Sequence, residues 1–214
     1  MSFKSTKIIE LGSCAFRQPQ ASSHCRFLHG YRLTAKFWFK AKELDSNNWV
    51  VDFGGLKQLK AILQTQFDHT LCISDDDPEI DRFSELDKAG VCDLRVMDGG
   101  VGVEKFAEFC YQSADSYVNQ LTNGRCRCVK AEVFEHENNS AIYEVNLDDH
   151  ETLMNTGCNE DITTEEVAED IATAVEVKQQ DSVTRPPFAK KKGAPLTARK
   201  TKGRWADERG TFGI

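Results

Sequence analysis

Apolar and polar residues alternate in the first part of the chain, with the two-residue period of half-buried strands. Residues 7–11 predict a first strand, and residues 32–39 predict a second strand with one strongly apolar face. A short apolar run at 49–53, ended by two glycines, predicts a third strand.

The period then changes to that of amphipathic helices. Leu56, Leu59, Leu63 and Phe67 fall on one helical face, and a second helix is predicted after Pro78, which suits a first helical turn. The strongest helical pattern spans residues 103–121 and follows a glycine pair. Further strands are predicted at 92–97, 126–135 and 141–145.

This order of elements places helices on one face of a mainly antiparallel sheet, which is an α+β fold. The globular domain is predicted to span residues 1–147. Residues 148–184 form an acidic linker with one short predicted helix, and residues 185–214 form a basic tail predicted to be disordered. The tail is either a solvated end or a binding segment for RNA or an acidic protein surface.

Composition narrows the class of protein. The 214 residues carry a formal net charge of −7, which argues against a general nucleic-acid binder. Eight cysteines are scattered without a small-scaffold framework, and no charged leader precedes an apolar run. We therefore expect reduced thiols and a cytoplasmic protein, and no apolar run is long enough to span a membrane.

Three fragments supply candidate chemistry. Cys25 lies between His24 and His29, and an Asp68-His69 pair follows the first predicted helix. Glu135 stands at the end of a later strand. A free thiol near an imidazole oriented by a carboxylate is typical of proton transfer, because an imidazolium favours the thiolate.

In their order and spacing these fragments resemble the 6-pyruvoyltetrahydropterin synthase and 6-carboxytetrahydropterin synthase family, over about the first 145 residues. The matching fragments are Cys25 to Tyr31, Val51-Asp52-Phe53, Phe67-Asp68-His69, Glu104 and Phe134-Glu135. Each fragment alone is a weak signal, whereas five in the same order make a specific match.

The resemblance implies a tunnelling fold, in which subunits assemble into a barrel as trimers or hexamers with active sites at subunit interfaces. It implies a lyase that eliminates triphosphate from 7,8-dihydroneopterin triphosphate, in a pathway to queuosine, folate or biopterin. Cys25 would be the general base, activated by Asp68 and His69, and Glu135 would hold the pterin edge. Glu104 would also contact the substrate.

The family's zinc ligands are only partly present. His29 matches one of them, but the next position of the family's His-Gly-His run is Tyr31, a weak zinc ligand. The ligand on the first strand corresponds either to Gln20 or to His24. Either His24 and His29 hold zinc with a further group that completes the site, or the site has lost zinc.

Each assignment has a plainer alternative. Cys25 could be an inert thiol, Asp68 a helix-end cap beside an exposed His69, and Glu135 a solvated acid. The alternative for the whole protein is a catalytically silent tunnelling-fold module whose C-terminal tail docks into a larger assembly.

Overall fold

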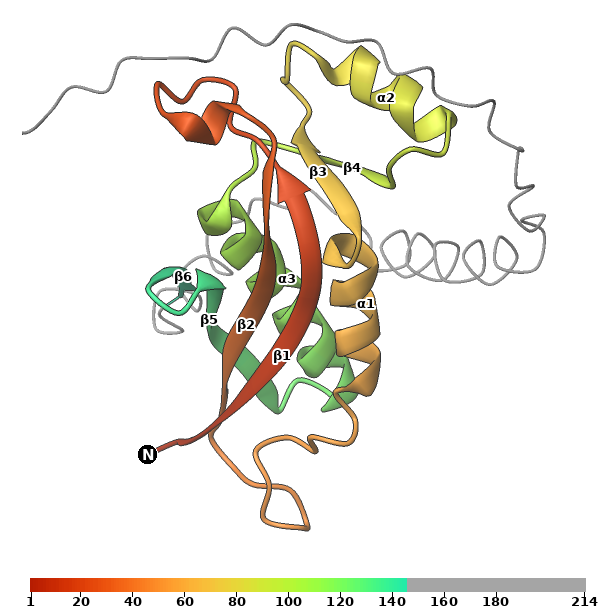
Figure 1. Ribbon diagram of the computed structural model, residues 1–214. Coiled ribbons are helices and arrows are strands. Elements are labelled where there is room, and N and C mark those ends of the chain that lie inside the picture. Colours follow the sequence, from red (N-terminus) through yellow and green to blue (C-terminus); the bar gives the residue numbers. More distant parts are fainter. Residues whose placement is uncertain (146–214) are drawn as a thin grey trace, which may run out of the picture. The chain divides into compact units, whose positions relative to one another are not determined.

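The computed structural model describes residues 1–145 (Figure 1). The predicted linker at 148–184 and the predicted tail at 185–214 lie outside the described residues. A six-stranded sheet has the strand order β4-β3-β1-β2-β5-β6. None of the helices in residues 1–145 has the length and apolar character needed to cross a membrane.

Four strands form the antiparallel part of the sheet. They are β1 (Phe3–Phe16), β2 (His29–Ala41), β5 (Cys126–His136) and β6 (Asn139–Glu144). β1 and β2 are longer than the predicted strands, and β2 pairs with β5 so that Thr34 lies opposite Phe134. The start of β2 therefore lies near the end of β5, which is where the candidate site forms.

Two short strands extend the sheet in parallel with β1. β3 (Thr70–Ser74) pairs with β1, and β4 (Leu94–Met97) pairs with β3. β4 falls within the predicted strand at 92–97, whereas β3 was not predicted. All five β3 residues are buried, so the strand lacks the alternation that marks a half-buried strand.

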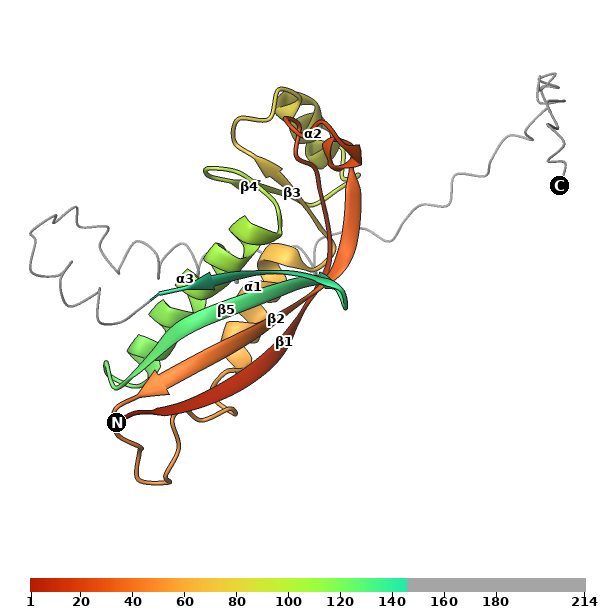
Figure 2. The same cartoon turned by 90° about the vertical axis from the view of Figure 1, so that its left-hand side faces the viewer.

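α1 (Lys57–Phe67) and α3 (Val103–Leu121) lie on the same face of the sheet (Figure 2), which confirms the predicted α+β arrangement. Their apolar faces and the inward side of the sheet form one core. Its largest fully buried side chains include Phe16, Phe37, Phe39, Phe67 and Phe106. α2 (Ile80–Lys88) packs separately, with Phe83 against Leu71 and Ile73 of β3.

The predicted strand at 49–53 is wrong. Val50 and Val51 are buried in the core, but the segment consists of turns and bends. The side chain of Asp45 accepts hydrogen bonds from the amides of Asn47 and Trp49, and Asp52 accepts one from Gly54. These side chains satisfy the backbone locally, so apolar burial here does not require a strand.

Candidate functional site

The Asp68-His69 pair forms at the end of α1. The helix ends at Phe67, Asp68 is extended, and His69 adopts a left-handed conformation with φ of 61°. His69 Nδ1 lies 2.9 Å from Asp68 Oδ1, and the same carboxylate oxygen accepts a hydrogen bond from the Ser13 amide at 3.3 Å. The His69 amide donates to the Ser13 carbonyl at 2.8 Å. The pair is therefore attached to the backbone of β1.

A pocket of about 350 Å³ lies beside this pair. Its lining includes His69 from the α1–β3 connection and Thr70 at the start of β3. The other lining residues come from β1 and β2 and are Ser13, Cys14, Ala15, Gly30, Tyr31 and Arg32. The His69 side chain is 85% exposed, so it is open to a ligand or to another subunit. The pocket joins His69 to Tyr31, which occupies the altered position of the zinc motif.

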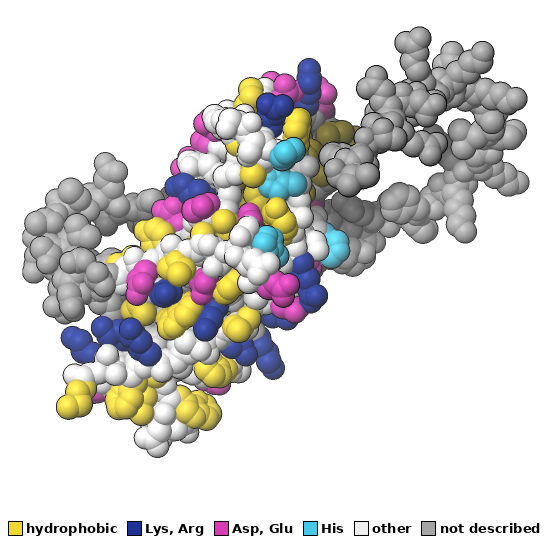
Figure 3. Space-filling model, turned by 60° about the vertical axis from the view of Figure 1, so that its left-hand side comes forward, with side chains coloured by type: hydrophobic (Ala, Val, Ile, Leu, Met, Phe, Trp, Pro, Cys, Tyr) yellow, Lys and Arg dark blue, Asp and Glu magenta, His cyan; other side chains and the backbone are white. Residues whose placement is uncertain are grey.

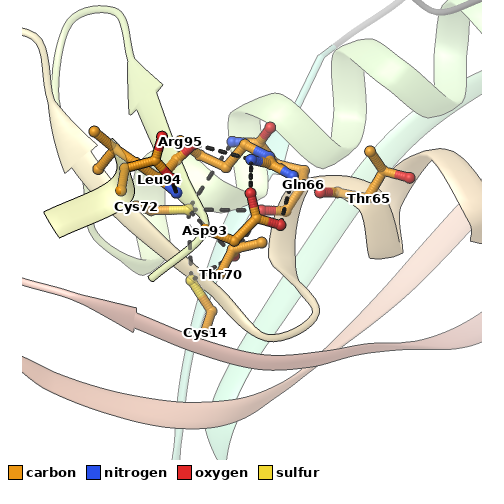
Figure 4. Close-up of polar contacts among 9 residues, drawn as sticks. Cys14, Thr65, Gln66, Thr70, Cys72, Asp93, Leu94 and Arg95 are labelled. Carbon is orange, nitrogen blue, oxygen red and sulfur yellow. Dashed lines mark hydrogen bonds and ion pairs between the residues drawn. The ribbon is translucent and has the colours of Figure 1, made fainter. Parts of the chain in front are cut away.

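A buried thiol pair connects β1 to β3 (Figure 4), and one of its members, Cys14, also lines the pocket. The Sγ atoms of Cys14 and Cys72 lie 3.5 Å apart, and the Thr70 hydroxyl donates to the Gln66 carbonyl at 2.8 Å. The hydrogen bond with Cys72 is the main cause that lowers the pKa of the Cys14 thiol, against the opposing effect of burial. Arg95 of β4 donates to the Thr65 carbonyl at 3.2 Å. Hydrogen bonds thus join the end of α1 to β1, β3 and β4. These contacts fix the position of His69, which lies between α1 and β3.

Aromatic rings connect the histidine of β2 with the end of β5. The His29 ring lies 4.6 Å from Phe16 and 5.7 Å from Tyr31, and the Tyr31 ring lies 6.0 Å from His136. Figure 3 shows histidine side chains gathered on one face of the molecule. From the sequence alone, His136 is expected to be a surface residue. It is exposed, but the antiparallel register of β2 and β5 places it beside Tyr31.

The two ring nitrogens of His29 have different surroundings. Nδ1 lies 2.7 Å from the Phe27 carbonyl, which can only accept, so Nδ1 carries hydrogen, and in the neutral ring the free lone pair is on Nε2. Histidine ligands in metal sites commonly have this arrangement.

The other predicted ligands do not complete a zinc site in one chain. His24 and Gln20 are exposed, and within residues 1–145 no three His, Cys, Asp or Glu side chains are close enough to hold a metal ion. A catalytic zinc site normally has three protein ligands. The donors that residues 1–145 of a single chain supply therefore do not fit zinc.

Cys25 lies in a short 3₁₀ turn, His24–Arg26, and is half-buried. Its carbonyl accepts a hydrogen bond from the Gln18 amide at 2.8 Å, and the Gln18 side chain donates to the Val101 carbonyl at 3.3 Å. Gln18 thus ties the Cys25 loop to the start of α3, where Glu104 is exposed in the first turn.

Cys25 and the Asp68-His69 pair are not joined within one chain. Across the described residues, no hydrogen bond or ion pair links Cys25 to Asp68 or His69, and Cys25 is not among the residues that line the pocket. The structure therefore assembles the acid-imidazole pair but does not bring the predicted thiol to it.

Glu135 lies at an irregularity in the pairing of β5 with β6, between Phe134 and His136. Its side chain is half-buried, and it has no hydrogen-bond or ion-pair partner in the part of the chain that the structure describes. A partly desolvated carboxylate without a partner can accept hydrogen bonds from a ligand.

Comparison with known proteins identifies a matching family model and two similar curated proteins. Residues 10–146 match the family model described as 6-pyruvoyl tetrahydropterin synthase. The chain is 35% identical over 78 residues to 6-carboxy-5,6,7,8-tetrahydropterin synthase of Rickettsia conorii, covering 36% of this chain and 56% of the relative. It is 40% identical over 57 residues to the enzyme of the same name from Rickettsia bellii, covering 26% of this chain and 41% of that relative. The matches therefore span about half of the relatives' length.

Among solved structures, an uncharacterized protein of Wolinella succinogenes matches with a TM-score of 0.59 at 16% identity. The match covers 68% of this chain and 99% of that protein, and it supports the fold alone. Since the family model matches more than half of the residues, the chain belongs to the 6-pyruvoyl tetrahydropterin synthase family.

Proposed function

We propose that the protein is a carbon–oxygen lyase of the 6-carboxytetrahydropterin synthase type, acting on 7,8-dihydroneopterin triphosphate. The observation that carries this proposal is the Asp68-His69 pair held on β1 beside a pocket, in a chain of this family. The names of the Rickettsia relatives support the reaction class.

In the proposed reaction the Cys25 thiolate removes a proton from a carbon of the pterin side chain. The electron pair of that C–H bond forms a double bond as the C–O bond to triphosphate breaks. The protonated His69 ring, oriented by Asp68, favours the Cys25 thiolate. After the elimination, His69 donates its proton to the released triphosphate and accepts the proton of the Cys25 thiol, which restores the starting pair.

Because Cys25 and His69 do not meet within one chain, we propose that they meet across subunits of a homo-oligomer, a trimer or a hexamer. The large exposed fraction of His69 suits this arrangement, since its ring is available to a neighbouring subunit. The exposed side chains of Phe27 and Leu28, next to Cys25, also suit a contact between subunits.

Glu135 is the proposed anchor of the pterin. The 2-amino-4-oxo edge of a pterin presents adjacent donors, and a carboxylate accepts such donors in a fork. A half-buried carboxylate without a partner is available for this role. Glu104 is the second proposed substrate contact, because Gln18 ties its helix start to the Cys25 loop.

The second candidate is a catalytically silent tunnelling-fold module. Tyr31 at the second position of the metal motif favours it, because a phenol is a poor zinc ligand unless it is deprotonated. A neighbouring subunit or a water would have to complete any site built on His24 and His29. No step of the proton-transfer scheme depends on zinc.

A turnover assay with 7,8-dihydroneopterin triphosphate tests the leading proposal. Triphosphate release should be abolished in Cys25→Ala and His69→Ala, while each variant keeps the oligomer. Cys126→Ala is a matched control, since Cys126 pairs with Ala41, at the opposite end of β2 from His29. A wild-type protein that binds no pterin and releases no triphosphate would support the silent module.

Metal analysis of the purified oligomer tests the zinc proposal separately. Near-stoichiometric zinc that is lost in His29→Ala would mean that further groups complete the site. An oligomer without metal that still turns over would show that this chain acts without zinc.

A further inference from the structure

The first strand of the sheet is interrupted where Asp68 approaches it. Pairing of β1 with β2 is regular up to Glu10 and shifts register between Glu10 and Gly12, so the strand contains a β-bulge. Gly12 has φ of +106°, a backbone conformation that residues other than glycine rarely adopt.

Asp68 occupies the space that a side chain at position 12 would need. A Cβ atom on Gly12 would lie 2.1 Å from Asp68 Oδ1, 2.4 Å from its Cγ and 2.5 Å from its Cβ. The overlaps include Cβ and Cγ of Asp68 and not only the end of a flexible chain. The Asp68 side chain therefore packs directly on the backbone of Gly12.

Hydrogen bonds on both sides of Gly12 fix the orientation of the Asp68-His69 pair. Ser13, the next residue, donates its amide to Asp68 Oδ1 and accepts the His69 amide. On the other side of the bulge, the Glu10 carbonyl accepts a hydrogen bond from the Gln64 side chain of α1 at 3.1 Å. The bulge thus binds the last turn of α1 and the two residues that follow it.

We infer that Gly12 is a positioning residue for the Asp68-His69 pair: its bulge admits the carboxylate, and the carboxylate orients the imidazole. This inference rests on the proposed function for its effect on turnover, although the geometry can be tested without activity. With Nδ1 held by Asp68, the Nε2 atom is left free to face the reacting thiol.

Gly12→Ala tests the inference, and Gly90→Ala is its matched control. Gly90 has φ of +69°, but a Cβ atom there would meet nothing within 4 Å, so this variant places alanine at a positive φ without the overlap. We expect Gly12→Ala to lower kcat on the order of 10²-fold with little change in KM. Gly90→Ala should keep full activity. Equal activities of the two variants would overturn the inference, provided that the wild type turns over.

A spectroscopic measurement separates failure of this inference from failure of the proposed function. In ¹⁵N-labelled wild-type protein, neutral His69 should be the Nδ1–H tautomer because Asp68 accepts that hydrogen. Gly12→Ala should shift His69 toward the Nε2–H tautomer that free histidine prefers, whereas Gly90→Ala should not. An unchanged tautomer in Gly12→Ala would overturn the inference even if the protein has no lyase activity.

A double-mutant cycle tests whether the effect runs through Asp68. In the wild-type background, Gly12→Ala should lower the Tm by clearly more than Gly90→Ala does. In an Asp68→Gly background the overlap disappears, so Gly12→Ala should lower the Tm by clearly less than it does in the wild-type background. A Tm loss that is independent of residue 68 would mean that Gly12 serves the strand and not the pair.

Discussion

At the scale of single residues, Asp77 is the one charged residue that is buried within the described range 1–145. Arg17 approaches it with two nitrogens, at 2.8 Å and 2.7 Å, and the Glu79 amide donates to Asp77 Oδ1 at 2.8 Å. The Arg17 guanidinium also lies over the Phe83 ring at 5.5 Å. The Arg17–Asp77 ion pair therefore connects the end of β1 to the start of α2.

Removing the carboxylate should therefore destabilise the protein. We expect Asp77→Ala to lower the free energy of unfolding by about 3 kcal/mol, because Arg17 would be left partly buried without its partner. Urea unfolding at neutral pH measures the change. Glu85→Ala, at an exposed position of the same helix, should change stability by less than about 0.5 kcal/mol. Similar losses in the two variants would contradict this account of the ion pair.

The same carboxylate predicts a pH dependence. Burial acts to raise the pKa of Asp77, but the hydrogen bonds from Arg17 and the Glu79 amide outweigh it, so the pKa lies below its ordinary value. The stabilisation is complete above the unfolded-state pKa of about 3.9 and is lost as the pH falls through the lower folded-state pKa. Unfolding measured from pH 6 to pH 2.5 should show a smaller acid-induced loss in Asp77→Ala than in the wild type. Parallel curves would contradict the prediction.

At the scale of elements, α3 supports the site through its aromatic contacts. Phe106 is fully buried, and its ring lies 5.0 Å from Phe16 and 5.1 Å from Phe67. Phe16 in turn contacts His29, and Phe67 is the last residue of α1 before Asp68. The Phe106 side chain of α3 therefore supports both His29 and the Asp68-His69 pair, each through one aromatic ring.

Truncating this side chain should affect stability and the site together. We expect Phe106→Ala to cost about 3–5 kcal/mol of unfolding free energy, because it leaves a cavity beside two aromatic rings. The His29 and His69 signals in NMR spectra should both shift. Leu121→Ala, at a position that is 44% exposed, should cost much less and leave these signals unchanged. A Phe106→Ala protein with wild-type stability would contradict this packing.

Elements with a clear period could be predicted from the sequence, and the others could not. α1, α3, β2 and β5 have apolar stripes that stand out from their polar neighbours. The segment at 49–53 has a strand-like composition, but Asp45 and Asp52 close turns there. β3 is buried at every position and only five residues long, so no alternation reveals it.

The candidate site was predictable in part for the same physical reason. Asp68 and His69 are adjacent in the chain, and their order after a helix is visible in the sequence. The contact of His136 with Tyr31 depends on the register of β2 with β5. The packing of Asp68 on Gly12 depends on how the end of α1 approaches β1. Such long-range contacts leave no local pattern of hydrophobicity.

At the scale of the whole molecule, the proposed active site uses Cys25 of one subunit and the Asp68-His69 pair of another. Neither Cys25→Ala nor His69→Ala should turn over alone. In an oligomer reassembled from equal amounts of both variants, a site is complete when an intact Cys25 meets an intact His69 of its neighbour.

Activity of this mixed oligomer is the most direct measurement. Random assembly of the two variants in a closed ring should restore about a quarter of wild-type turnover. Mass spectrometry of the intact oligomers would confirm that both variants are present in one assembly. Hybrid oligomers that form but release no triphosphate, beside an active wild type, would contradict the shared site.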